Sequence, residues 1–170
     1  RKNLKEYSED MEEKVRERTE EVVRQKEEIE KQSEQIAELY EQVKDSILYA
    51  KRIQEAILPS KEEIDQSLKQ SMVLFRPKDI VSGDFYWFSE KNDKAIIAAA
   101  DCTGHGVPGA LMSMIGSSLL NEIVNEKGIT QPNEILLALK HGVIKALNKH
   151  PSSDQTKDGM DIAICTIPKK

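Results

Sequence analysis

The chain has 170 residues, 25 of them basic and 30 acidic, which gives a formal net charge of −5. This mild negative charge gives no reason to expect nucleic acid as a partner. The longest purely apolar run, 95–100, is far shorter than the roughly 20 residues that cross a bilayer, and the N-terminus does not resemble a signal peptide. We therefore expect a cytoplasmic chain with no membrane contact in this segment, which leaves room for membrane attachment further upstream in a longer protein.

Residues 1–58 are expected to form a coiled-coil signalling helix. They contain no glycine, no proline and 28 charged residues, 12 basic and 16 acidic. A heptad seam runs through Val15, Val22, Ile29, Ile36, Val43, Ala50 and Ile57. A second seam, three residues on, includes Arg18, Gln25, Gln32 and Ser46, whose polar groups weaken the association. The pattern predicts a weakly held parallel homodimer that connects an upstream sensor domain to the rest of the chain. The alternative is a solvated helix with no signalling role.

Residues 59–170 have the composition of a globular domain. Short aliphatic and aromatic runs predict strands at 72–75, 84–88, 95–100 and 160–167. Helical spacing of apolar residues predicts one helix after Pro108, as far as about Ile123, and a second from about Pro132 to a point before Pro151. Strands followed by a helix pair indicate an α+β fold with helices on a largely antiparallel sheet. About 110 residues is small for such a domain, so we expect it to be incomplete at its C-terminus.

Two carboxylate motifs flank the predicted strand 95–100. The first reads Ser-Gly-Asp-Phe-Tyr-Trp at 82–87, and the second reads Ala-Asp-Cys-Thr-Gly-His-Gly at 100–106. Asp84 and Asp101 could hold one divalent metal ion, because carboxylates, carbonyls and water form the oxygen shell that Mg²⁺ or Mn²⁺ prefers. The alternative is that both aspartates only cap turns.

Three ordered motifs, at 76–87, 100–110 and 158–161, resemble the SpoIIE/RsbU-like branch of the PP2C (PPM) protein phosphatases, and 49–60 resembles the helix that enters that domain. The resemblance implies a partial β-sandwich flanked by helices, two Mn²⁺ or Mg²⁺ ions that activate water, and hydrolysis of phosphoserine or phosphothreonine. It also implies a phosphorylated protein substrate, which in related proteins is often a small anti-sigma-factor antagonist.

Residue by residue, the resemblance implies that Asp84 is the first metal ligand and that Asp101 bridges both ions. Cys102 matches the position that binds metal through its backbone carbonyl. Asp158 and Asp161 match a strand-entry motif and not the late metal-binding aspartates of the family, for which the chain has no match. We therefore expect this segment by itself to be weak or inactive.

Two further residues and one rival function complete the predictions. Arg76 is a candidate for clamping substrate phosphate, with a surface or ion-pairing role as the alternative. His105 is either a proton donor to the leaving group or a structural hydrogen-bonding residue. The rival to a regulated metal-dependent phosphatase is a dimerising interaction module whose phosphatase-like part is not catalytic.

Overall fold

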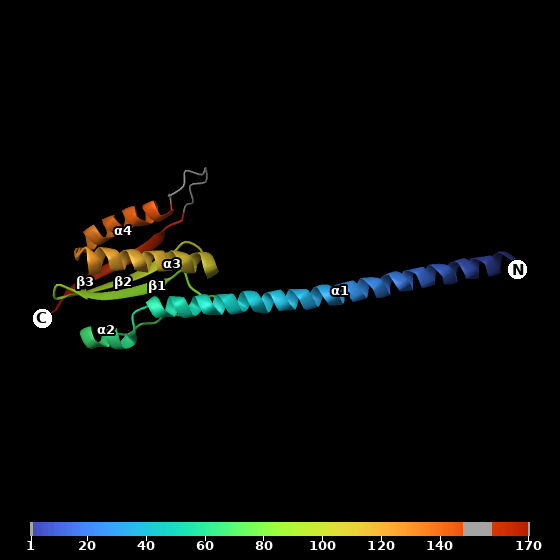
Figure 1. The fold of residues 1–170 in the computed structure, drawn as a ribbon, viewed down its shortest axis with the longest axis horizontal. Helices are drawn as coiled ribbons and strands as arrows, with labels where there is room; N and C mark the ends of the chain where they lie inside the picture. Colours follow the sequence, from blue (N-terminus) through green and yellow to red (C-terminus); the bar gives the residue numbers. More distant parts are fainter. Residues whose placement is uncertain (1, 148–157, 170) are drawn as a thin grey trace. The chain divides into compact units, whose positions relative to one another are not determined.

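A computed structural model describes residues 2–147 and 158–169. Its elements, in chain order, are α1 (Lys2–Ile57), α2 (Lys61–Ser67), β1 (Phe85–Lys91), β2 (Lys94–Cys102), α3 (Gly106–Leu120), the π-helical η1 (Asn121–Glu126), α4 (Pro132–Leu147) and β3 (Met160–Pro168) (Figure 1). The chain divides into two compact units, Arg1–Ser46 and Ile47–Lys170. The last turns of α1 thus belong to the second unit, and the predicted domain boundary at residue 58 stays a prediction.

The first unit consists only of the N-terminal part of α1, and α1 as a whole confirms the predicted long helix. Ion pairs between residues one turn apart lie on its surface. Lys14 Nζ is 2.7 Å from Asp10 Oδ2, and Arg18 Nη1 is 2.9 Å from Glu21 Oε2. The predicted first seam is open to solvent, with exposed fractions from 59% to 66% at Val15, Val22, Ile29, Ile36 and Val43. Apolar side chains are more stable when they are removed from water, so this exposed row on α1 is available to pack against a partner.

The second unit is built on an antiparallel sheet in the order β1-β2-β3 within the described residues. Asn92 and Asp93 join β1 to β2 with φ angles of 52° and 56°, the left-handed backbone that a tight hairpin requires. In the register Phe85 pairs with Ala100, and Ala100 pairs with Ile162. The strands predicted at 84–88, 95–100 and 160–167 are confirmed, each with slightly different ends, and so is the α+β fold class.

One face of the sheet carries the core and is covered by α3 and α4 (Figure 1). Side chains alternate along β1 and β2, so every second residue enters this layer. Both predicted helices are present, but α3 starts two residues before Pro108 and continues as η1. The predicted end of α4, before Pro151, lies outside the described residues. The core side chains of this layer include Phe85, Trp87, Ile96, Ala98, Leu120, Ile123, Ile135 and Leu139.

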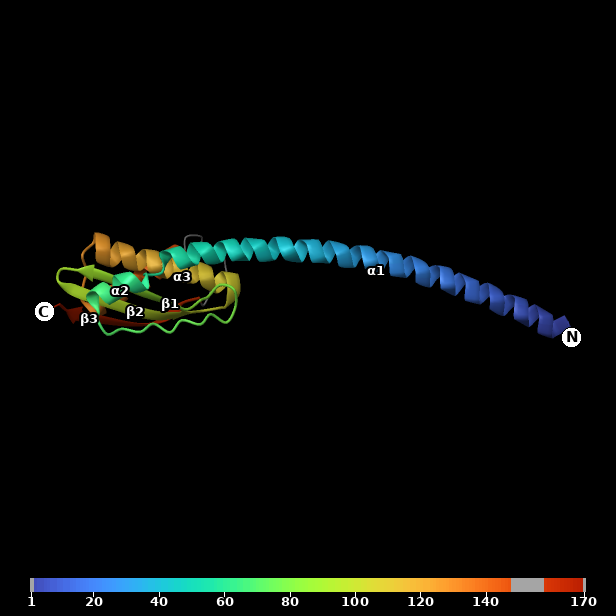
Figure 2. The same cartoon turned by 90° about the horizontal axis from the view of Figure 1, so that it is seen from below.

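The opposite face of the sheet is only partly covered, by α2 and the segment after it (Figure 2). The sequence analysis did not anticipate α2, although Ser60 and Glu63 form a reciprocal capping box at its start. The prediction of a strand at 72–75 is wrong, because this segment has no regular secondary structure. Met72 and Leu74 are 88% and 77% exposed, so their apolar character reflects neither a strand nor burial in the described structure.

The stretch Gly106–Glu126, formed by α3 and η1, is the part of the described chain that is long and apolar enough to span a membrane. Half of its most apolar window is buried inside the protein. A core helix that packs on a sheet has this same composition, so the stretch by itself does not indicate a membrane span.

Candidate active site

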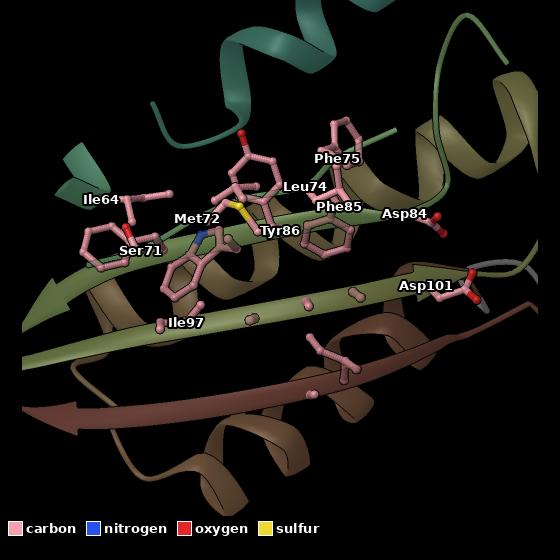
Figure 3. A pocket seen from close by; sticks show the side chains of 18 of the residues that line it. Ile64, Ser71, Met72, Leu74, Phe75, Asp84, Phe85, Tyr86, Ile97 and Asp101 are labelled. Carbon is pink, nitrogen blue, oxygen red and sulfur yellow. The ribbon is translucent and has the colours of Figure 1, made fainter. Parts of the chain in front are cut away.

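The structure brings the two predicted aspartates together at one end of the sheet. Asp84 directly precedes β1 and Asp101 lies near the end of β2, and because Phe85 pairs with Ala100 the next step of the register sets Asp84 opposite Asp101. Figure 3 shows both side chains at this end. Burial raises the pKa of the Asp84 carboxyl, and a hydrogen bond and negative charge from Asp101 raise it further. Two carboxyl groups this close repel each other when ionised, and a cation relieves that repulsion.

Glycine lets the backbone at Asp84 pack tightly against the end of β2. A Cβ at Gly83 would lie 2.7 Å from the carbonyl oxygen of Gly104 and 3.1 Å from that of Cys102. Gly104 itself has a φ of 91°, a conformation that L side chains rarely adopt. The segments that carry the two aspartates are therefore in direct backbone contact, so a shift of one displaces the other.

The side chain of Cys102 is an unsuitable metal ligand here. It is 3% exposed and belongs to the core on the helix-covered side of the sheet. Burial, together with the charges of Asp101 and Asp84, raises the pKa of the thiol to about 11. The thiol is thus protonated near neutral pH, whereas a metal requires the thiolate. The carbonyl oxygen of Cys102 lies close to the Gly83 backbone, and its predicted role as a metal ligand stays a prediction.

The motif at 158–161 joins the same end of the sheet. The amide of Thr103 donates to the Gly159 carbonyl at 2.9 Å, and the Gly159 amide donates to the Thr103 hydroxyl oxygen at 3.1 Å. Asp161 then pairs with Asp101 in the register. The sequence analysis did not place Asp161 beside Asp101, since strand pairing across 60 residues leaves no local signal. Within residues 2–147 and 158–169, no three His, Cys, Asp or Glu side chains are grouped closely enough to hold an ion.

A cavity of about 930 Å³ extends from the aspartates along the open face of the sheet (Figure 3). Arg76, Asp84, Asp101 and Asp161 line it together with apolar side chains. Arg76 is exposed and forms no ion pair with any described residue. Its guanidinium is therefore free to bind an anionic ligand, and its predicted phosphate role stays a prediction.

His105 lies at the start of α3 and pairs with Asp79, with Nδ1 2.9 Å from the Asp79 carboxylate oxygen. This contact is the structural hydrogen bond that the sequence analysis set beside a role in proton donation. The ring is largely exposed, so its second nitrogen is open to solvent or to a substrate.

The arrangement fits part of the shell of a hard divalent ion. Asp84 and Asp101 supply carboxylate oxygens and Cys102 supplies a carbonyl oxygen, and Mg²⁺ commonly keeps several waters beside one or two protein carboxylates. The close approach at Gly83 keeps these donors on adjoining segments. We call these three predicted donors, Asp84, Asp101 and the Cys102 carbonyl, the half-shell; their binding of a metal ion stays a prediction.

An antiparallel sheet with helices packed on one face and two aspartates opposed at its end is the arrangement set beside known proteins here. No protein-family model matches the chain. Among curated proteins, it is similar to the phosphoserine phosphatase RsbU of Bacillus subtilis (strain 168), with 32% identity over 102 residues. Among solved structures, it is similar to the SiaA-PP2C domain of Pseudomonas aeruginosa, with a TM-score of 0.63 and 32% sequence identity over 73% of this chain.

These two similarities confirm the resemblance to RsbU-like PP2C phosphatases. The RsbU match uses 59% of this chain but spans 29% of RsbU, and the structural match spans 48% of the SiaA-PP2C chain. Each relative therefore contains much that has no counterpart in these 170 residues.

Proposed function

We propose that this chain is part of a cytoplasmic, metal-dependent phosphatase that removes phosphate from serine or threonine of a phosphorylated protein. The observation that carries the proposal is that Asp84 lies opposite Asp101, one step beyond the Phe85–Ala100 pair of the register, and that both line a cavity that Arg76 also lines. The similarity to a phosphoserine phosphatase supports the same reaction. A small anti-sigma-factor antagonist is the substrate type that best fits this relationship.

Each residue has a defined task in the proposed reaction. Asp84, Asp101 and the Cys102 carbonyl would hold one or two Mn²⁺ or Mg²⁺ ions. Such ions, when bound, lower the pKa of water and offset the negative charge of the phosphoryl group. Arg76 would bind phosphate oxygens through its planar guanidinium and so orient the phosphoester toward the aspartates. The open cavity admits a surface loop of a protein, and no covalent nucleophile is needed.

We further propose that α1 controls the activity as a parallel homodimeric coiled coil that receives its signal from an upstream sensor. The exposed row of β-branched residues on α1 supports this regulation, because two such rows bury each other in a dimer. The polar residues of the second seam, including Gln25 and Gln32, weaken one helix arrangement and leave a second one accessible.

The test of the enzyme is Mn²⁺-dependent release of phosphate from a phosphoprotein by the full-length protein. Asp101→Asn keeps the size of the side chain but removes its charge, and we expect it to lower the rate by at least about a hundredfold. Unchanged activity in Asp101→Asn would refute the proposed chemistry.

A second candidate function is a dimerising interaction module without catalysis. It is favoured by the exposed seam and by the lack, in the described part of the chain, of a complete metal-binding group. Calorimetric titration of the full-length protein with Mn²⁺ separates the two functions: binding at two sites supports the enzyme, and no binding supports the module.

A further inference from the structure

Gln54 is buried although it lies on α1, a helix of mostly exposed residues. Its exposed fraction is 4%, and it belongs to the same compact unit as the candidate active site. Its Nε2 donates to the Ser82 carbonyl at 2.6 Å, and its Oε1 accepts from the Ser82 amide at 3.0 Å. One side-chain amide therefore pairs with both backbone groups of a single residue, much as a neighbouring strand would.

A third contact fixes the orientation of this amide. Nε2 of Gln54 also donates to the hydroxyl oxygen of Ser113 on α3, at 2.8 Å. The Ser113 hydroxyl lies 2.8 Å from the Ala110 carbonyl and 3.3 Å from the Ser82 carbonyl, so it can donate to either. Ser113 and Ser82 are 1% and 5% exposed. Water has little access to these groups, so the loss of Gln54 would leave the polar groups of Ser82 without an adequate partner.

Ser82 is two residues before Asp84, and the residue between them is tightly packed. Gly83 packs against the carbonyls of Cys102 and Gly104, and its Cα lies 3.0 Å from the position that a Cβ on Gly109 would take. The segment is thus held on one side by Gln54 and on the other by the backbone that carries Asp101 and Cys102. Gln54 therefore contacts the backbone two residues before Asp84.

We propose that Gln54 is a positioning residue: by pairing with the Ser82 backbone it holds Asp84 opposite Asp101, and so keeps the predicted metal ligands together. This inference rests on the proposed metal-dependent function. Because Ser82 and Asp84 are two residues apart, the hydrogen bonds at Ser82 limit how far the backbone of Asp84 can move.

The test uses the full-length protein and Mn²⁺ alone. Gln54→Met keeps the length of the side chain but removes its hydrogen bonds, and we expect Mn²⁺ affinity by calorimetry to fall by about tenfold or more, as for other partners that orient metal ligands. The matched control is Val143→Ala on α4, which removes buried volume away from the network. It should lower the melting temperature yet keep Mn²⁺ affinity within about twofold of wild type, since its effect is on packing alone.

Hydrogen exchange supplies a readout that does not depend on metal binding. In the wild-type protein the Ser82 amide should exchange slowly, and Gln54→Met should accelerate its exchange together with that of Asp84. If wild-type Ser82 exchanged as fast as an exposed loop, or if Gln54→Met bound Mn²⁺ as tightly as wild type, the positioning role would be overturned while the proposed enzyme stood. If the wild-type protein bound no Mn²⁺, both proposals would fall together.

Discussion

Replacing Gly83 with alanine should disturb the candidate site through one added methyl group. The new Cβ would lie 2.7 Å from the Gly104 carbonyl oxygen, whereas ordinary contact begins at 3.4 Å, so the backbones must separate by about 0.7 Å (3.4 − 2.7). Neither partner is a flexible side-chain end, because the contacts are with backbone atoms of Gly104, Cys102 and Gly109. Overpacking of this kind destabilises a folded domain by about 1–3 kcal/mol.

The same displacement separates the segments that carry Asp84 and Asp101. Catalytic groups must be held to within roughly 0.5 Å of their working geometry, so a shift of this size should lower Mn²⁺-dependent phosphate release by about ten- to a hundredfold. The assay measures phosphate release and the midpoint of urea unfolding for the full-length Gly83→Ala variant and the wild type.

The matched control is Gly159→Ala, at the start of the motif that bonds to Thr103. A Cβ at Gly159 meets no described atom within 4 Å, and both backbone hydrogen bonds to Thr103 survive the change. Its activity and stability should therefore stay close to wild type. If Gly83→Ala behaved like Gly159→Ala, the backbone contact would not constrain the aspartates and the reasoning from steric fit would be wrong.

Two further predictions concern the thiols and the helix. Cys165 is exposed, whereas Cys102 is buried and its thiol has a pKa of about 11. Iodoacetamide at pH 8, followed by mass spectrometry, should therefore modify Cys165 and leave Cys102 unmodified until the protein unfolds. Equal rates at both cysteines would show that the Cys102 thiol is not protected. The double substitution Val22→Asp and Ile29→Asp places two negative charges in the exposed first seam of α1. It should shift the full-length protein from dimer toward monomer, as measured by light scattering. An unchanged mass would exclude this seam as the dimer contact.

The elements that could be read from the sequence are those with strong local patterns. Residues 2–57 form a helix because no proline or glycine interrupts a run of charged and heptad-spaced residues. The strand 94–102 is recognisable because its apolar run is short and is bounded by turn residues. The segment 72–75 has similar apolar residues but no strand beside it among the described elements, and apolar character alone does not make a strand.

The residues of the candidate site also divide into those with a local sequence pattern and those without one. Asp84 and Asp101 could be singled out because each sits in a short motif beside a predicted strand, where glycine and carboxylate occur together. Asp161 and Gln54 could not, because each becomes relevant through a partner far away in sequence: Asp101 for the first, and Ser82 and Ser113 for the second.

By itself, the sequence determined the long helix, the α+β class and the two motifs that carry Asp84 and Asp101, because helix periodicity, strand length and glycine-carboxylate pairs are local properties of the chain. Only the tertiary structure decided that Asp84 faces Asp101, that the Cys102 thiol points into the core, and that Gln54 forms hydrogen bonds with the Ser82 backbone beside the site. These outcomes depend on strand register and on which buried polar groups find each other, and both are settled only when the whole sheet and its covering helices pack together.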